Sequence, residues 1–375
     1  MRSEPPVPAD VLAKIREPLV LGDAVCVDAP LLQPLNLLLD LAGEAMRARL
    51  FVVQAEGGAE ACLRPDFTVA VARQHIESGA SSGRYFYEGP AFRSAPQDDW
   101  AEEFIQLGVE LFSSTGRAKV ENDVEAAKLA WRAAVAGGRD DLILWLGDVG
   151  LFSALIEALE LPTALAARLK RVAGRPRMLN AELARVGAAP GVAPGGQLAA
   201  MLSGLTQADA AAMLEEVWAL AGVEPVGGRG AAEIAARLVR RAAAVTAPAL
   251  NAAQAEAIQA FMDISEDPSS GLQKIRTLTK GSPGLNAALA DWETRLAGLA
   301  EVPADRLRFA PALGHAFDYY DGLTFEVRSR SLGAERPVAS GGRFDGLLAR
   351  LGGPQGACAV GCVVRPWRAF AGGER

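Results

Sequence analysis

The stretch formed by residues 63–112 constrains the fold of this chain more than any other segment. Two segments rich in apolar and aromatic residues, 85–92 and 104–112, flank a polar loop at 94–101. This is the pattern of two strands joined by a long hairpin. The sequence therefore predicts a sheet that contains this hairpin.

Polar side chains occupy one face of the second predicted strand. Side chains of a strand alternate between its two faces, so Gln106, Gly108 and Glu110 share a face, and the glycine leaves space between the two polar groups. The first predicted strand ends on Arg93. A carboxylate, an amide and a guanidinium around a gap are suited to a small zwitterion. A solvated sheet face explains the same pattern equally well.

Composition narrows the classes of protein and site. The chain has 375 residues, half of them hydrophobic, which is enough for two or more domains with a sizeable core. A formal charge of -7 argues against a general nucleic-acid surface. The four cysteines are too sparse for a disulfide scaffold, and Cys358 and Cys362 have no nearby histidine with which to form a zinc site. We expect no metal. No signal peptide and no membrane-spanning run is recognisable, so we expect a cytoplasmic protein without a membrane partner.

The middle of the chain, residues 156–300, is predicted to be a helical insertion. Alanine, leucine and arginine dominate there, and glycine-proline loops at 187–196 and 223–230 separate helix-sized segments. Thr206 precedes an apolar helix predicted at 207–221 and is its expected N-cap. The glycine-rich loops invite a phosphate-binding interpretation, but they lack its spacing, and flexible linkers are the simpler explanation.

Two other local features have simple interpretations. Residues 1–8 are rich in proline and are expected to be loose. His75 lies on a helix predicted at 69–77, where a surface or core-edge histidine is commoner than a ligand.

Several motifs, in order, resemble the catalytic core of histidyl-tRNA synthetases, a family of class II aminoacyl-tRNA synthetases. The motifs are RPDFT, YEGPAFR, EEFIQLGVE, HAFDYYDGLTFE, GGRFDGLLARLGG and AVGCVVRPWR. The resemblance implies an α+β fold with a class II aminoacyl-tRNA synthetase-like antiparallel sheet flanked by helices. The synthetase-like domain would comprise residues 1–155 and 301–375, with the helical insertion between them and no anticodon-binding domain.

The resemblance also implies a pocket for histidine. Asp66, Thr68 and Gln106 would face the ammonium group, while Glu110 and Tyr320 would hold the imidazole. Carboxylates, amides and hydroxyls are suited to these contacts. The histidine-binding set that the resemblance implies is Asp66, Thr68, Arg93, Gln106, Glu110, Tyr319 and Tyr320. Two departures predict a weaker pocket: Asp66 is shorter than the usual glutamate, and Phe344 replaces a tyrosine.

The chemistry of aminoacylation is less well preserved. Arg93 and Arg368 match arginines of the family, but Glu102 and His315 stand where arginines are expected. Arg365 replaces a glycine that floors the nucleotide pocket in the family. We therefore expect no catalytic residue, no cofactor and no nucleic-acid partner.

These losses are typical of a related family, the regulatory subunits of short-form ATP phosphoribosyltransferase, which act in histidine biosynthesis. This resemblance implies a hetero-oligomer with the short catalytic subunit, built on a homodimer core near Pro30, with free histidine as a possible effector. Two alternatives stay open. One is a free-standing class II ligase that adenylates an amino acid, and the other is a scaffold with a vestigial pocket.

Overall fold

The computed structural model describes residues 2–54, 58, 60–95, 97, 100–114, 119–173, 176–186, 205–222, 231–232, 234–236, 238–239, 249–279, 281–314 and 319–373. The chain forms two compact units. The first comprises Met1–Phe152 with Phe261–Arg375, and the second comprises Ser153–Ala260.

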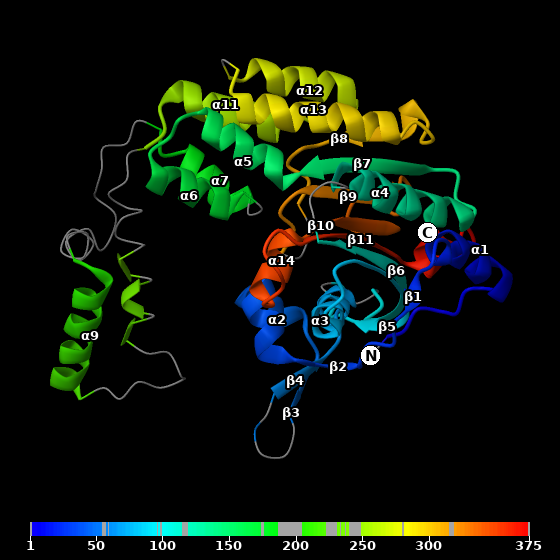
Figure 1. Cartoon of the computed structure of the whole chain (residues 1–375), viewed down its shortest axis with the longest axis horizontal. Coiled ribbons are helices and arrows are strands. Elements are labelled where there is room, and N and C mark those ends of the chain that lie inside the picture. The colour runs from blue at the N-terminus through cyan, green and yellow to red at the C-terminus, as the bar shows by residue number, and fades with distance from the viewer. Residues whose placement is uncertain are drawn as a thin grey trace. The chain divides into compact units, whose positions relative to one another are not determined.

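An eight-stranded sheet forms the centre of the first unit, in the order β1-β5-β6-β11-β10-β9-β7-β8 (Figure 1). Its neighbouring strands are antiparallel, apart from the parallel pairs β1–β5 and β7–β8. In sheet order the strands are Val25–Cys26, Gly83–Phe92, Glu103–Ser113, Cys358–Val364, Ala339–Arg343, Leu323–Ser329, Leu142–Asp148 and Leu307–Phe309. This arrangement, with helices on the sheet, confirms the predicted α+β fold.

The predicted hairpin consists of β5 and β6. The strands pair from Gly83 opposite Phe112 to Phe92 opposite Glu103, so the register extends over the whole of β5. Strand β6 pairs on its other side with β11, which places Gly361 opposite Glu110. Strand β6, which carries the polar face, is therefore a central strand of the sheet and not an edge strand.

Helices cover the sheet of the first unit. Helix α4 packs along β9, β10 and β11 and also contacts α1. The helices of this unit are α1 (Ala9–Val20), α2 (Leu35–Ala42), α3 (Thr68–Ser78), α4 (Lys119–Ala136), α12 (Pro268–Thr277), α13 (Pro283–Gly298), α14 (Asp345–Arg350) and α15 (Pro366–Ala369), with 3-10 turns η1 (Glu44–Arg49) and η3 (Ala304–Arg306). A three-stranded sheet in the order β2-β4-β3 (Leu32–Pro34, Glu60–Leu63, Val52–Gln54) lies beside α2.

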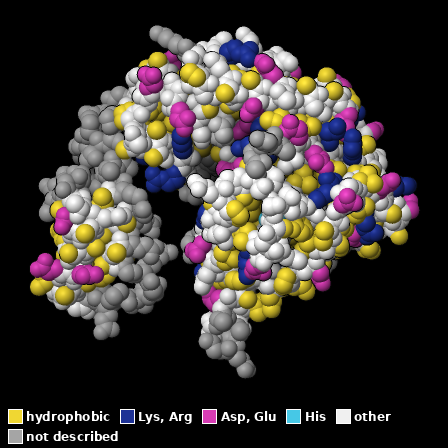
Figure 2. Space-filling model, viewed as in Figure 1, with side chains coloured by type: hydrophobic (Ala, Val, Ile, Leu, Met, Phe, Trp, Pro, Cys, Tyr) yellow, Lys and Arg dark blue, Asp and Glu magenta, His cyan; other side chains and the backbone are white. Residues whose placement is uncertain are grey.

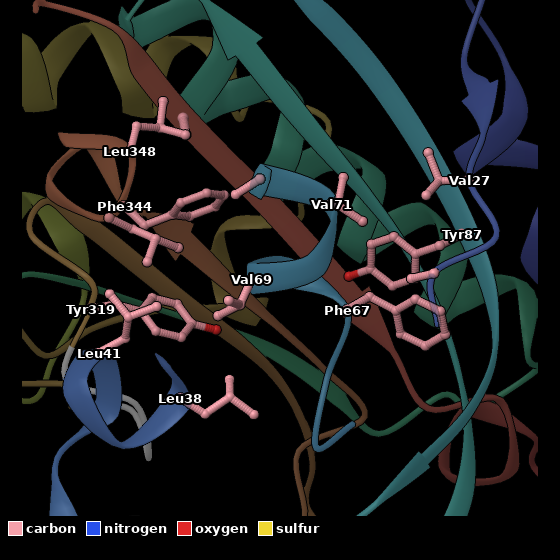
Figure 3. Packing of buried hydrophobic residues seen from close by; sticks show 14 of the residues in the cluster. Val27, Leu38, Leu41, Phe67, Val69, Val71, Tyr87, Tyr319, Phe344 and Leu348 are labelled. Atoms are coloured by element: carbon pink, nitrogen blue, oxygen red, sulfur yellow. The ribbon is translucent and has the colours of Figure 1, made fainter. Parts of the chain in front are cut away.

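The main apolar cluster packs α2, α3 and α14 against β5 and β6 (Figure 3). The rings of Phe67 and Tyr87 are stacked in it, with centroids 4.4 Å apart. His75 is also buried there. Its ring stacks on Phe112 at 4.3 Å, and its Nδ1 lies 3.0 Å from the hydroxyl of Tyr85. His75 is therefore a core residue.

Residues 2–4 are ordered, so the expectation of a loose segment at 1–8 is wrong for them. The amide of Glu4 donates to the carbonyl of Glu103, and the amides of Glu102 and Glu103 donate to the carbonyl of Arg2. The segment therefore extends the sheet beside the first residues of β6. Proline richness in the sequence gave no sign of this long-range pairing.

The boundary of the second unit also differs from the predicted insertion at 156–300. Helices α12 and α13 belong to the first unit. The ring of Trp292 on α13 packs edge-to-face on Phe309 of β8 at 4.9 Å, and Gly271 of α12 lies against the same phenylalanine. Their alanine- and leucine-rich sequence resembles that of the predicted insertion, but their packing partners lie in the first unit.

The second unit is helical within its described residues. It contains α6 (Thr163–Val172), α7 (Pro176–Leu183) and α9 (Gln207–Ala221); α5 (Val149–Ala158) enters it and α11 (Ala252–Met262) leaves it. The hydroxyl of Thr206 accepts a hydrogen bond of 3.2 Å from the amide of Asp209, which confirms the predicted cap and start of α9. The glycine-rich loops at 187–196 and 223–230 lie outside the described residues.

Two expectations concern features that the described part of the chain lacks. None of its helices is both long and apolar enough to cross a membrane. Within the same residues, no three metal-ligating side chains are close enough to hold a metal ion. All four cysteines are free, and Cys358 and Cys362 are buried, as expected for small core residues.

Candidate functional site

A cavity of about 230 Å³ lies in the first unit, beside the β5–β6 hairpin and the start of α3. Seven residues singled out in the sequence contribute to its lining. They are Asp66, Thr68, Arg93, Tyr319, Tyr320, Arg365 and Arg368. Side chains more than 250 residues apart therefore meet in one site.

Asp66 provides a buried carboxylate at this cavity. Its side chain lies at the end of the turn before α3, and only 7 % of the residue is exposed. Neither carboxylate oxygen has a hydrogen-bond partner among the described residues. Burial raises the pKa of Asp66, whereas Arg93, the backbone amides of Thr68 and Val69, and the Tyr319 hydroxyl lower it. These neighbouring donors act on the carboxylate without forming a well-directed hydrogen bond to it, and a bound ammonium group would supply one.

Glu110 is also buried but is already satisfied within the protein. Its Oε1 accepts a 2.7 Å hydrogen bond from the Thr68 hydroxyl and a 3.3 Å hydrogen bond from the Tyr87 hydroxyl. The gap expected at Gly108 is filled, because a Cβ there would overlap the hydroxyl of Tyr87. A Cβ at Gly361 would likewise overlap the carboxylate of Glu110. These two glycines allow the tyrosine and the glutamate to pack inside the sheet.

The structure separates the predicted residues of β6 from the cavity. Gln106 and Glu110 are 2 % and 1 % exposed, and neither is among the residues described as lining the cavity. Burial raises the pKa of Glu110 to about 8 despite the hydrogen bonds from Thr68 and Tyr87. Glu110 is thus mostly neutral at pH 7. Thr68 and Tyr87, which do line the cavity, lie between it and Glu110.

Two tyrosines complete the polar part of the lining. The rings of Tyr319 and Tyr320 have centroids 4.7 Å apart, and both tyrosines have raised pKa values, chiefly because they are buried. Phe344 packs edge-to-face on both rings, at 6.1 and 6.5 Å. It is 1 % exposed and is not among the described lining residues. Its role is therefore to support the tyrosines.

Four arginines line the cavity: Arg49, Arg93, Arg365 and Arg368. Arg93 donates from Nε to the carbonyl of Pro65 at 2.8 Å, and Arg368 donates to the carbonyl of Pro337 at 3.3 Å. Burial and the neighbouring Arg93 lower the pKa of Arg49. Arg49 was not recognised in the sequence, because it lies in the η1 turn and outside every motif.

Arg365 packs against the face of the Phe104 ring. Its guanidinium carbon lies 3.4 Å from the ring centroid of Phe104, and its side chain forms an ion pair with Glu4. Burial and Arg368 lower the pKa of Arg365 to about 9. Arg365 therefore lines the cavity from the face of Phe104.

Glu102 and His315 are the two other positions at which the sequence departs from the synthetase motifs. Glu102 forms an ion pair with Arg2 at 3.6 Å, so its charge is directed to the N-terminal segment. His315 lies outside the described residues. On the face drawn in Figure 2, basic and acidic side chains of the first unit are interspersed.

The arrangement is suited to a small zwitterion. A buried carboxylate and a set of arginines line one cavity, together with three tyrosines and a threonine. The carboxylate can bind an ammonium group, an arginine can bind a carboxylate, and hydroxyls can bind a polar ring.

The comparisons with known proteins agree with these observations. The family model described as histidyl-tRNA synthetase matches residues 25–229 and 231–366. A protein of Mesorhizobium japonicum named ATP phosphoribosyltransferase regulatory subunit is 34% identical over 90% of each chain. A Brucella anthropi protein of the same name is 32% identical over 94% of each chain.

A solved structure extends the similarity to the fold. The crystal structure titled as an ATP phosphoribosyltransferase regulatory subunit/histidyl-tRNA synthetase from Bacillus halodurans aligns with a TM-score of 0.63 at 20% identity. The alignment covers 96% of this chain and 77% of the other. With the two close relatives, it leads to one conclusion: the chain belongs to the histidyl-tRNA synthetase-like family and, within it, to the ATP phosphoribosyltransferase regulatory subunits.

Proposed function

We propose that this chain is a non-catalytic partner of the ATP phosphoribosyltransferase catalytic subunit and that its cavity binds free histidine as an effector. Membership of the regulatory-subunit family supports the partnership and a role in histidine biosynthesis. The observation that carries the effector part is Asp66, a buried carboxylate that lines the cavity and accepts no well-directed hydrogen bond from the described residues. The chemistry of the reaction would then belong to the partner.

The polar groups of the cavity can accommodate the three parts of histidine. The ammonium group would lie at Asp66, and the carboxylate would lie at Arg93, whose charge already acts on Asp66. The imidazole would lie against the hydroxyls of Thr68, Tyr87 and the two adjacent tyrosines. Glu110 would act through the hydroxyls of Thr68 and Tyr87, and not by direct contact.

The effector would act by linkage. A ligand shifts an equilibrium between assembly states only by the difference in its affinity for them, and such couplings are typically about 1–3 kcal/mol. The start of α3 carries Thr68, and β5 and β6 carry Tyr87 and Glu110, so an occupied cavity would stabilise these elements against each other. Inhibition would follow if the catalytic subunit is less active in that state.

The test is reconstitution with the catalytic subunit, with histidine added over a range of concentrations. We expect activation of phosphoribosyl-ATP formation and inhibition by histidine. Asp66→Asn should weaken the inhibition at least tenfold while activation is retained, since it removes the charge that binds the ammonium. Glu77→Gln on α3 is the matched control, because this glutamate is exposed and pairs only with Arg73 in the described structure. Unchanged histidine inhibition in Asp66→Asn would refute the effector site.

A homodimer core is the second part of the proposed assembly. Four large apolar side chains are exposed on or beside the small three-stranded sheet: Leu31, Leu32, Val52 and Val53. An exposed cluster of this kind favours burial against another chain. Leu32→Glu should shift the sedimentation of the isolated chain from dimer to monomer, whereas Leu220→Glu in the second unit, which is 84 % exposed, should not. A monomeric parent chain would contradict the dimer.

The ligase alternative retains one supporting observation, because Arg93 and Arg368 line the same cavity. Arg365 opposes it by covering Phe104, the aromatic face on which a base could stack. Pyrophosphate exchange that depends on an amino acid distinguishes the two functions. We expect none above background, and measurable exchange would favour the ligase.

A further inference from the structure

The arginines of the cavity concentrate positive charge in a partly buried place. Arg368 and Arg93 both act on Arg365 as like charges. Among the described acidic residues at the lining, Glu326 is already bonded at 2.6 Å to Arg328, and Glu335 is exposed. The counter-charge that reaches Arg365 comes instead from Glu4, which lies 361 residues away in the sequence.

The carboxylate of Glu4 is buried against the guanidinium of Arg365, which lines the cavity. The side chain of Glu4 is only 6% exposed, and that of Arg365 is 10% exposed. Three backbone hydrogen bonds between residues 2–4 and residues 102–103 direct Glu4 inward. The Ser3 hydroxyl adds a bond to the side chain of Glu103, in which both groups are exposed.

Arg365 has capacity for more than this one partner. Its Nε is buried and has no hydrogen-bond partner among the described residues. A guanidinium presents a planar fork of donors that suits two oxygens of one carboxylate or phosphate. The guanidinium also packs over the ring of Phe104, so it is held in position before any ligand arrives.

We propose that Glu4 is a displaceable internal occupant of an anion-binding site at Arg365, so that residues 2–4 and a small ligand with a carboxylate or phosphate group compete for the same guanidinium. The site rests on the cavity but not on histidine as its ligand. Residues 2–4 would then leave Arg365 when an anion occupies the cavity, so the position of this segment depends on whether the cavity is occupied.

The attachment of the segment is weak enough to be reversible. A backbone hydrogen bond contributes about 0.5–1.5 kcal/mol net, so three of them and one ion pair amount to a few kcal/mol. Local openings of this free energy are common at the ends of chains. While the segment is bound for more than about nine-tenths of the time, the apparent affinity for a competing anion is reduced at least tenfold.

Glu4→Gln tests the competition, because the amide has the size of the carboxylate but lacks its charge. Binding of inorganic phosphate and of acetate to the full chain is measured by calorimetry, one probe at a time. We expect Glu4→Gln to bind one of these anions at least tenfold more tightly than the parent. Tighter binding of phosphate alone or of acetate alone identifies the anionic group. Ser3→Ala is the matched control, since it changes the same segment at an exposed bond and should leave both affinities unchanged.

Equal affinities in the parent and Glu4→Gln would overturn the proposal. If the variant does not fold, hydrogen exchange on the parent chain decides. Addition of the anion should then increase the exchange rates of the amides of Glu4, Glu102 and Glu103, which bond the segment to β6. Unchanged exchange at saturating phosphate and acetate would show that no displacement occurs. Because neither probe carries an amine, failure here would leave the histidine site untouched.

Discussion

Asp66 and Glu110 are two buried carboxyl groups in one site, and their surroundings give them different roles. Asp66 lines the cavity and accepts no well-directed hydrogen bond from the described residues, whereas Glu110 accepts bonds from Thr68 and Tyr87 behind the lining. Burial raises the pKa of both. In the proposed histidine site, the first would bind the ammonium group, and the second would support the hydroxyls of Thr68 and Tyr87. The family resemblance implied a direct contact with histidine for both.

The raised pKa of Glu110 predicts a distinct pH dependence of stability. Its pKa is about 8 in the folded chain against an ordinary value of 4.5. The folded state thus binds a proton that the unfolded state releases, so this contribution is fully present below pH 4.5 and is lost as the pH rises toward 8. Between pH 6 and pH 8, the contribution of Glu110 to the free energy of unfolding should fall by about 2 kcal/mol.

Glu110→Gln should remove this slope. Urea unfolding at pH 6 and pH 8 measures the difference between the parent and the variant, which cancels the other titrating groups. Between pH 6 and pH 8, we expect the free energy of unfolding of the variant to fall by about 2 kcal/mol less than that of the parent. Glu77→Gln, at an exposed position of α3, should follow the parent profile. Parallel profiles for the parent and Glu110→Gln would mean that Glu110 does not carry the proton.

At the scale of elements, one buried aspartate joins three parts of the first unit. Asp123 of α4 is fully buried and bonds Arg343 of β10 and Arg295 of α13, both at 2.9 Å from Nε. Arg343 also bonds Asp345, at the start of α14. These contacts, with the packing on Phe309, explain why α13 belongs to the synthetase-like domain. Helical periodicity at 119–136 predicts α4 but does not identify its ionic partners.

Asp123→Asn should be strongly destabilising. The substitution keeps the size of the side chain but leaves two buried arginines with less counter-charge. Removal of one member of a buried ionic cluster typically costs about 3–5 kcal/mol, and the free energy from urea unfolding measures it. Glu121→Gln, on the exposed surface of the same helix, should change stability by less than about 0.5 kcal/mol. A loss below about 1 kcal/mol for Asp123→Asn would show that water compensates the arginines.

At the scale of the whole molecule, the two units have different relations to function. The cavity, the N-terminal segment and the exposed apolar side chains of the small sheet all belong to the first unit. The second unit contributes helices without a described site residue. The regulatory response that we propose should therefore be measurable on the full chain as ligand-linked stability.

Histidine should stabilise the full chain, and histidinol should do so much less. Free histidine at one hundred times its dissociation constant raises the free energy of unfolding by about 2.7 kcal/mol. Histidinol lacks the carboxylate and so loses the contact with Arg93, a charged hydrogen bond worth about 1.5–3 kcal/mol. Thermal unfolding with each compound at the same concentration measures the effect. Equal shifts with the two compounds would show that Arg93 does not contact the ligand. No shift with either compound would favour the scaffold alternative.

Several elements of the fold could be predicted from local patterns in the sequence. Alternation predicts the β5–β6 hairpin and the shared face of Gln106 and Glu110, and a threonine before an apolar run predicts the start of α9 at Gln207. These signals are local, because strand alternation and helix capping depend on neighbours only a few residues away. The ordered motifs also identified the family and the fold.

The way in which these elements pack together could not be predicted from local patterns and depends on contacts between distant segments. The tertiary structure filled the gap at Gly108 with Tyr87, added Arg49 from a turn, and joined Glu4 to Arg365 across most of the chain. The packing of side chains from distant segments has no periodicity to detect. A polar strand face can line a cavity or be buried in the core, according to which distant side chain packs against it. That outcome depends on how the sheet and α3 pack together.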